Sequence, residues 1–377
     1  MNDQAIRCEV AHNLGGVRSE WDALVDASPL PSPFLKSWWL ENASAGTPTI
    51  LRCTDPTGRL VGGAAFEADV LGVSGRGVRR LRSVGQGVLA PDHIDVVAAG
   101  ADHDAVSLTI ARWLRTSGCV VDLDGLAARC RLPELLGARV LDSMPAPYLD
   151  LTGMDPQAPL AGMPGQLRST VKRSAKRLAK AGFGVHRVDR SGHPDTRDGA
   201  VDTLIALHGE RWDDSSELSG DAARLRSILR AGMTAGDVVI HELRGEGDGG
   251  EGDGGGGEAR VIASEVELVA GDRACFYQAG RLTDREFRGS GSVLKEAILR
   301  WALDEGLTEF DLLRGAEPYK DDWTSTSRPV IRMRTGSGAM ASTAAHAMNL
   351  WTDAAPRVAR LRGHLGRFSP SPSRSGP

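Results

Sequence analysis

Five residues with side chains suited to chemistry lie in one ten-residue stretch: Asp311, Arg314, Glu317, Tyr319 and Lys320. Carboxylates and a phenol can exchange protons with a bound molecule, whereas Arg and Lys bind phosphate or carboxylate groups. The stretch begins inside an apolar segment, Glu309–Leu313, which predicts a buried strand. Such a cluster can also be a salt-bridge network around a loop, but five polar residues at one strand end favour a functional site.

A second group, Arg288-Gly289-Ser290-Gly291-Ser292, separates a strand pattern ending at Gly280 from an amphipathic helix expected to begin at about Val293. Glycines let the backbone turn sharply, and a helix carries partial positive charge at its N-terminus. The combination predicts an anion site for a phosphate or pyrophosphate, with Arg288 as a charged donor. The alternative is a tight turn that caps the helix. The spacing matches neither a Walker loop nor a dinucleotide fingerprint.

A third feature is a basic amphipathic helix without any acidic residue. Its cationic residues are Arg168, Lys172, Arg173, Lys176, Arg177 and Lys180, and Leu167, Val171, Ser174, Ala175 and Leu178 line the opposite face. Such a helix can be a solvated surface, or it can bind a polyanion such as tRNA, a nucleotide-linked or phospholipid-linked sugar, or the phosphates of a cofactor.

Two further places carry residues of interest. The glycine-bounded loop at 85–93 presents Asp92 and His93, which can orient a substrate or simply close a turn. A helix expected over Val201–Trp212 ends with His208, Arg211 and Trp212.

Composition indicates a soluble globular protein. The 377 residues are 41% hydrophobic and 25% charged, and the net charge of −4 gives no strong global field that would select nucleic acid or membrane. Five scattered cysteines show no metal-ligand spacing, so we expect reduced thiols, no metal and a cytoplasmic location. No run is long enough to span a membrane, and the N-terminal residues do not resemble a signal peptide.

Alternating strand and helix patterns predict an α/β (α+β) fold with more than one unit. We expect an N-terminal domain over 1–150, a C-terminal domain over 151–336, and a helix with a disordered tail over 337–377. A tract of glycine and acidic residues at 244–260 lies between two strand patterns and predicts an enlarged hairpin loop.

Together these residues resemble the GNAT superfamily, specifically its FemAB-like, cellulose-biosynthesis-protein-like branch. The resemblance rests on Arg211-Trp212, on Gly289-Ser290-Gly291 before a long helix, and above all on the string from Phe310 to Lys320, FDLLRGAEPYK. The string Ala146–Asp150 and the basic helix are also similar to this branch. One departure is Glu286, which occupies the place where the GNAT pyrophosphate motif usually begins with Gln or Arg.

The resemblance implies two GNAT-type mixed-sheet units that form a pseudo-dimer within one chain, the C-terminal one being catalytic. It implies an N-acyltransferase that moves an acyl group from acyl-CoA to an amine of a small molecule, a sugar, or an envelope or exopolysaccharide precursor. In the peptidoglycan-bridge relatives the donor is instead an aminoacyl-tRNA. A third alternative is a non-catalytic GNAT-like binding module. The oligomeric state beyond the pseudo-dimer is left open.

An amine must lose a proton to attack an acyl carbonyl, so a base is required. Asp311 is the first candidate, followed by Glu317 and His208, and Tyr319 can protonate the leaving thiolate. No nucleophilic Ser or Cys lies in a recognisable elbow, which favours direct transfer without a covalent intermediate. We expect the donor at residues 288–292, and substrate contacts from a further set: Arg211, Trp212, Tyr277, Arg314 and Lys320.

Overall fold

The computed structural model describes residues 6–73, 76–212, 221–245 and 259–365, and the side chains of 73, 76, 210–212 and 355–365 are outside that description. The strands are β1 (Arg7–Ala11), β2 (Thr47–Thr54), β3 (Leu60–Val73), β4 (Arg76–Arg82), β5 (Val97–Ala98), β6 (Val120–Ala127), β7 (Arg139–Asp150), β8 (Gly184–Val188), β9 (Val238–Gly245), β10 (Arg260–Ala270), β11 (Arg273–Arg281), β12 (Glu309–Asp311) and β13 (Ser327–Gly336).

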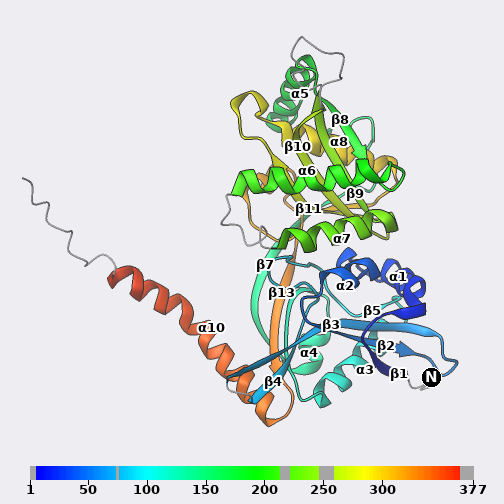
Figure 1. The fold of residues 1–377 in the computed structure, drawn as a ribbon, viewed down its shortest axis with the longest axis vertical. Coiled ribbons are helices and arrows are strands. Elements are labelled where there is room, and N and C mark those ends of the chain that lie inside the picture. The colour runs from blue at the N-terminus through cyan, green and yellow to red at the C-terminus, as the bar shows by residue number, and fades with distance from the viewer. Residues whose placement is uncertain (1–5, 74–75, 213–220, 246–258, 366–377) are drawn as a thin grey trace, which may run out of the picture.

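The helices are α1 (Arg18–Asp26), α2 (Ser37–Ala43), α3 (His103–Thr116), α4 (Leu132–Leu136), α5 (Gly165–Lys180), α6 (Pro194–Trp212), α7 (Ala222–Ala235), α8 (Ser290–Asp304), α9 (Pro318–Asp321) and α10 (Ala339–Leu365). The fold is therefore mixed α/β, as the sequence predicts. Figure 1 shows one body built around β1 to β6 and a second built around β8 to β11.

A continuous mixed sheet connects the two bodies. Its strand order is β1-β2-β3-β4-β6-β13-β7-β12-β11-β10-β9-β8, and β5 pairs with β3. The long strand β7 pairs with β13 through its first part and with β12 through Tyr148, Leu149 and Asp150. In Figure 1 β7 and β13 run together from one body toward the other. Strand β13 comes late in the chain, yet it lies between β6 and β7.

Helices cover both faces of the C-terminal part of the sheet. Alternation along β11 directs Cys275 and Tyr277 into one apolar cluster, which α6 and α7 also enter. Ala274 belongs to a second apolar cluster, together with side chains of α5 and α8. The basic helix expected over 168–180 is α5, and Leu167, Val171, Ser174 and Leu178 face inward as predicted.

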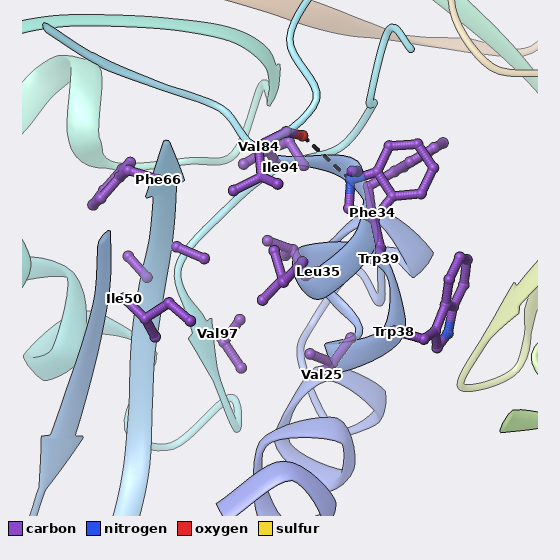
Figure 2. Packing of buried hydrophobic residues seen from close by; sticks show 14 of the residues in the cluster. Val25, Phe34, Leu35, Trp38, Trp39, Ile50, Phe66, Val84, Ile94 and Val97 are labelled. Carbon is purple, nitrogen blue, oxygen red and sulfur yellow. Dashed lines mark hydrogen bonds between the residues drawn. The ribbon is translucent and has the colours of Figure 1, made fainter. Parts of the chain in front are cut away.

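An aromatic cluster joins the N-terminal body to β11. The Phe34 ring lies 4.8 Å from the Trp39 ring, and the Tyr277 ring lies 5.7 Å from each of them. Figure 2 shows Phe34, Leu35 and Trp39 packed beside Val84 and Ile94, with the Trp39 indole N–H donating to the Val84 carbonyl. Trp38 points away from this group (Figure 2), and its N–H donates to Asp237 before β9 at 2.9 Å. The two bodies therefore share one core.

Several sequence expectations need correction. Helix α8 begins at Ser290 rather than near Val293, with Gly289 as its N-cap residue at φ +85°. Strand β12 ends at Asp311, two residues earlier than predicted. Cys8 and Cys53, expected as thiols, lie directly opposite each other on β1 and β2 and form a disulfide. The spacing of cysteines in sequence does not reveal such a pairing. Cys119, Cys130 and Cys275 are buried free thiols, as expected.

The hairpin expected around the glycine–acid tract is confirmed, because β9 and β10 pair antiparallel up to Gly245 and Arg260. Most of the tract itself lies outside the described residues, and so does the tail at 366–377.

Candidate functional site

The neighbouring parallel strands β11 and β12 separate in the middle of the sheet. Their pairing ends at Cys275 and Asp311, whereas β11 continues to Arg281. Beyond Asp311 the chain leaves the sheet and forms a loop and the short helix α9. A cavity of about 570 Å³ opens between the two segments. Its walls are Ala90, Asp92, His208, Phe276, Tyr277, Gln278, Ala279, Leu312, Leu313, Arg314, Glu317, Pro318, Tyr319 and Lys320.

This cavity brings together most of the catalytic and substrate residues expected from the sequence. His208 reaches it from α6, where its Nδ1 atom lies 3.3 Å from the carbonyl oxygen of Ala279. Glycine at position 280 lets α6 approach β11 closely, because a Cβ atom there would come within 2.5 Å of the backbone nitrogen of His208. Glu317 and Tyr319 come from the segment after β12, and both are exposed. These three side chains can donate or accept protons at the cavity.

Arg314 and Lys320 also line the cavity, but their polar atoms are occupied within the protein. The Arg314 guanidinium donates to Asp92, to Asp124 at 2.9 Å and to the Pro91 carbonyl at 2.5 Å. The Lys320 ammonium donates to the carbonyl oxygens of Leu313 and Arg314 at 3.1 and 3.0 Å and lies 2.9 Å from Glu317. Their geometry fits holding the loop after β12 better than holding a substrate anion.

Tyr277 contributes its ring to the wall, and its hydroxyl donates to the Leu89 carbonyl at 3.0 Å. Burial raises the pKa of this phenol. It is therefore neutral at physiological pH and is engaged with the N-terminal body. Arg211 and Trp212 form the end of α6, and their side chains are outside the described part of the structure.

Asp311, the first candidate base, does not line the cavity. It is completely buried, with Oδ2 2.7 Å from Arg273 and 2.9 Å from His93 Nε2, and Oδ1 accepts the Leu313 N–H at 2.7 Å. Burial alone would raise the pKa of this carboxyl, but His93, Arg273 and Arg328 outweigh burial and lower the pKa below its usual value. A buried, paired and weakly basic carboxylate is better suited to positioning the loop than to accepting a proton.

Backbone strain is concentrated around the cavity. Among the described residues, the non-glycine positions with positive φ are Ala90 at 43°, His93 at 56° and Leu313 at 57°. Ala90 and Leu313 line the cavity, and His93 contacts Asp311. Such conformations cost free energy and persist where the surroundings enforce them, often at functional sites.

The N-terminal body supplies part of this site. Asp92 accepts the Arg314 backbone N–H at 2.6 Å and pairs with its guanidinium. Burial raises the pKa of Asp92, although Arg314 and His93 act in the opposite direction. The sequence presented Asp92 and His93 in a glycine-bounded loop, but it could not show that they meet Arg314 and Asp311. Gln278, a further polar residue of the cavity wall, had no signal in the sequence.

The glycine loop lies at the N-terminus of α8 and presents several unused donors. The first helical hydrogen bond runs from Val293 to Gly289, so the N–H groups of residues 290–292 stay available. The buried Ser290 hydroxyl has no hydrogen-bond partner. A Cβ atom at Gly291 would meet only the Arg281 guanidinium, at 3.4 Å. The loop therefore offers N–H donors, a hydroxyl and an open approach to an anion.

Helix α5 packs directly against this loop. Its Ser174 side chain lies beneath Gly289, where a Cβ atom would collide with it, and the Arg177 guanidinium donates to the Arg288 carbonyl. Arg173, Lys176 and Arg288 are exposed. The basic helix and the glycine loop thus form one cationic surface, which sequence spacing alone did not place together.

Among the described residues, no group of three or more His, Cys, Asp or Glu side chains is arranged to hold a metal ion. In the same part of the chain, no helix has both the length and the apolar content needed to cross a membrane.

Comparison with known proteins finds a matching family and similar folds. Residues 165–321, which include α5, the glycine loop and the α9 segment, match the model of the acetyltransferase (GNAT) domain family. Residues 165–321 are therefore similar in sequence to a GNAT domain. No curated protein sequence matches the chain.

Solved structures show the same fold over nearly the whole chain. The crystal structure of FemX has a TM-score of 0.61 and 12% identity, covering 86% of this chain and 96% of its own. The L-PGS of Bacillus licheniformis has a TM-score of 0.56 and 10% identity, covering 90% and 95%. The C-terminal domain of a putative lysylphosphatidylglycerol synthetase from Agrobacterium fabrum has a TM-score of 0.54 and 14% identity, covering 89% and 97%. The chain thus has a FemAB-like GNAT fold.

Proposed function

We propose that the protein is an N-acyltransferase that moves an acyl group from acyl-CoA to an amine in the cavity between β11 and β12. The separation of these two strands carries the proposal, because it exposes the backbone edge of β11 inside a cavity lined by His208, Glu317 and Tyr319. Backbone N–H groups at such an edge can stabilise the oxyanion that forms when an amine attacks an acyl carbonyl.

The glycine loop is the proposed donor site. Its N–H groups at 290–292 and the unpartnered Ser290 hydroxyl suit the pyrophosphate of a CoA thioester, and the helix N-terminus and Arg288 add positive charge. Glu286 is exposed and precedes the loop, so the departure from the usual motif leaves the N–H groups of residues 290–292 in place.

Proton transfer is assigned to the residues that border the cavity. His208 or Glu317 accepts the proton of the attacking amine, directly or through water, and Tyr319 donates to the leaving thiolate. Asp311, Arg314 and Lys320 then act as positioning residues, because they hold the loop after β12 against Asp92 and Arg273. The acceptor is proposed to be the amine of a small molecule, a sugar or an envelope precursor, and the reaction to be cytoplasmic, where CoA thioesters are made.

A second donor class, aminoacyl-tRNA, is favoured by one specific observation. The exposed cations of α5 adjoin the glycine loop, and a polynucleotide can be held by such a row of charges. Transferase activity that is lost after ribonuclease treatment, and that CoA thioesters do not support, would assign the protein to this class.

The glycine loop provides the direct test. In Gly291→Val the new side chain enters the space proposed for the pyrophosphate, and within the protein it meets only the flexible Arg281. Calorimetric titration with acetyl-CoA should show binding weakened about tenfold or more, equivalent to about 1.4 kcal/mol. Gly199→Val is the matched control, because Gly199 lies in α6 with open space around its Cβ position.

Equal affinity of Gly291→Val and wild type would place the donor elsewhere. Binding of acetyl-CoA without turnover on any amine in an acceptor panel would instead support the non-catalytic module.

A further inference from the structure

Helix α10 packs on the body of the protein as far as Asp353 and then leaves it. Ala341 and Ala345 pack on Val120, and Arg139 donates to Asp353 at 2.8 and 3.0 Å. Beyond that contact the helix continues to Leu365. Figure 1 shows it projecting away from both bodies, next to β4 at its base. One side of the helix therefore faces the protein as far as Asp353.

The outward side of α10 carries three exposed large apolar side chains. Met340 is 78% exposed, Leu350 57% and Trp351 73%. Met340 and Trp351 are eleven positions apart, which corresponds to about three helical turns and brings them to the same side of the helix. An exposed tryptophan within an apolar stripe is typical of a surface that is covered when the protein works.

The net positive charge of residues 354–377 indicates what kind of partner covers the apolar side chains. The sequence from 354 to 377 contains five arginines and no acidic residue, whereas the whole chain carries a net charge of −4. Two copies of the helix packed side by side in parallel would bring the two arginine-rich segments together without a compensating acid. An anionic lipid surface satisfies both properties, because it accepts an apolar stripe and attracts the arginines that follow it.

We propose that α10 lies in the plane of an anionic lipid membrane and tethers the protein to it. The helix lies on the membrane rather than across it, because its exposed apolar side chains occupy one side while the other side contacts the protein. The inference is independent of the acyl donor. It implies that the catalytic body works close to a lipid surface, where an acceptor carried on a lipid would be within reach.

The test is co-sedimentation of the full chain with vesicles of phosphatidylcholine alone or mixed with phosphatidylglycerol. Wild type should bind the mixed vesicles about tenfold more tightly than the neutral ones, and added salt should reduce the difference. Leu350→Glu combined with Trp351→Glu should lose this binding. Val10→Glu is the control, because Val10 is 47% exposed on the edge strand β1.

The proposal is overturned if wild type ignores phosphatidylglycerol vesicles or if the double variant binds them as wild type does. A dimer in light scattering that only the double variant abolishes would assign α10 to a second copy, and would overturn it as well. Circular dichroism and acetyl-CoA titration check that the double variant is folded. Because neither changed residue lies at the cavity, failure of this proposal leaves the transferase proposal standing.

Discussion

The side chain of Asp311 shows how burial changes the role of a residue. Its type and its place at a strand end suggested a base, but the carboxylate is enclosed by Arg273, His93 and Arg328. Their charges lower its pKa, so the carboxylate is stabilised as an ion and has little tendency to take up a proton. The residues left to accept a proton are the less buried His208 and Glu317.

Asp311→Asn should therefore lower the free energy of unfolding, rather than act mainly on the rate of acyl transfer. It leaves Arg273 and His93 buried without their counter-charge, and loss of one partner of a buried pair costs about 3–5 kcal/mol. A carboxyl with a lowered folded-state pKa stabilises the protein above its unfolded pKa and loses that contribution as pH falls through the folded value. In denaturant titrations, the gap between wild type and variant should be full at pH 7 and narrow below about pH 4. A fully stable variant with abolished turnover would instead return Asp311 to the role of base.

His208→Asn and Glu317→Gln test the base directly. Loss of a general base lowers the rate by about a hundredfold to ten-thousandfold, while acetyl-CoA affinity should stay within a factor of about two. One of the two variants should show this loss in steady-state kinetics. His193→Asn serves as the control, because His193 is exposed before α6 and away from the cavity. If both variants turn over at the wild-type rate, neither His208 nor Glu317 is the base, and another group accepts the proton of the attacking amine.

At the scale of elements, the cationic surface is made by two segments that are far apart in sequence. Helix α5 and the loop before α8 meet through Ser174, Gly289 and Arg177. Each was recognisable alone, the helix from its period and the loop from its glycines. Their contact was not recognisable, because it depends on how α5 packs across the sheet.

Changing Arg173, Lys176 and Arg177 together to Gln should raise the KM of the donor and reduce its dependence on salt, because fewer cations then attract its phosphates. An acetyl-CoA donor should show a moderate change, and an aminoacyl-tRNA donor a large one. The matched control is Arg226→Gln with Arg230→Gln on α7, which removes charges of the same sign from exposed ion pairs. An unchanged KM across a salt series would reduce α5 to a solvated face.

Local patterns predicted most elements, and they failed where partners are distant in sequence. The inward face of α5, the β9–β10 hairpin and the buried aromatic residues of α2 all follow from periodicity and turn signals. The start of α8 was misplaced because Ser290, Gly291 and Ser292 are weak helix formers that tertiary packing holds in helical form. The Cys8–Cys53 disulfide depends on the register of β1 and β2, and the Asp92–Arg314 ion pair depends on the contact between the two bodies. Neither can be read from local patterns in a single sequence.

At the scale of the whole molecule, neither body is complete without the other. Ala90 and Asp92 of the N-terminal body line the cavity of the C-terminal body, and Trp38 donates to Asp237 across the boundary. The cavity is thus a property of the pair, and the N-terminal body has a direct part in its shape.

The position of β13 between β6 and β7 also determines when the protein can fold during its synthesis. A ribosome releases the first 150 residues long before residues 327–336 exist, so β6 and β7 must wait for most of the chain with open edges. A chain ending at Thr326 should therefore fail to fold and should be degraded, whereas a chain ending at Leu365 should fold. Pulse-labelling followed by protease treatment distinguishes the two, because only the folded chain resists digestion. Early protease resistance of the shorter chain would show that β6 and β7 can close without β13. Delayed closure of this kind gives chaperones a defined substrate, an incomplete sheet whose last strand is still being translated.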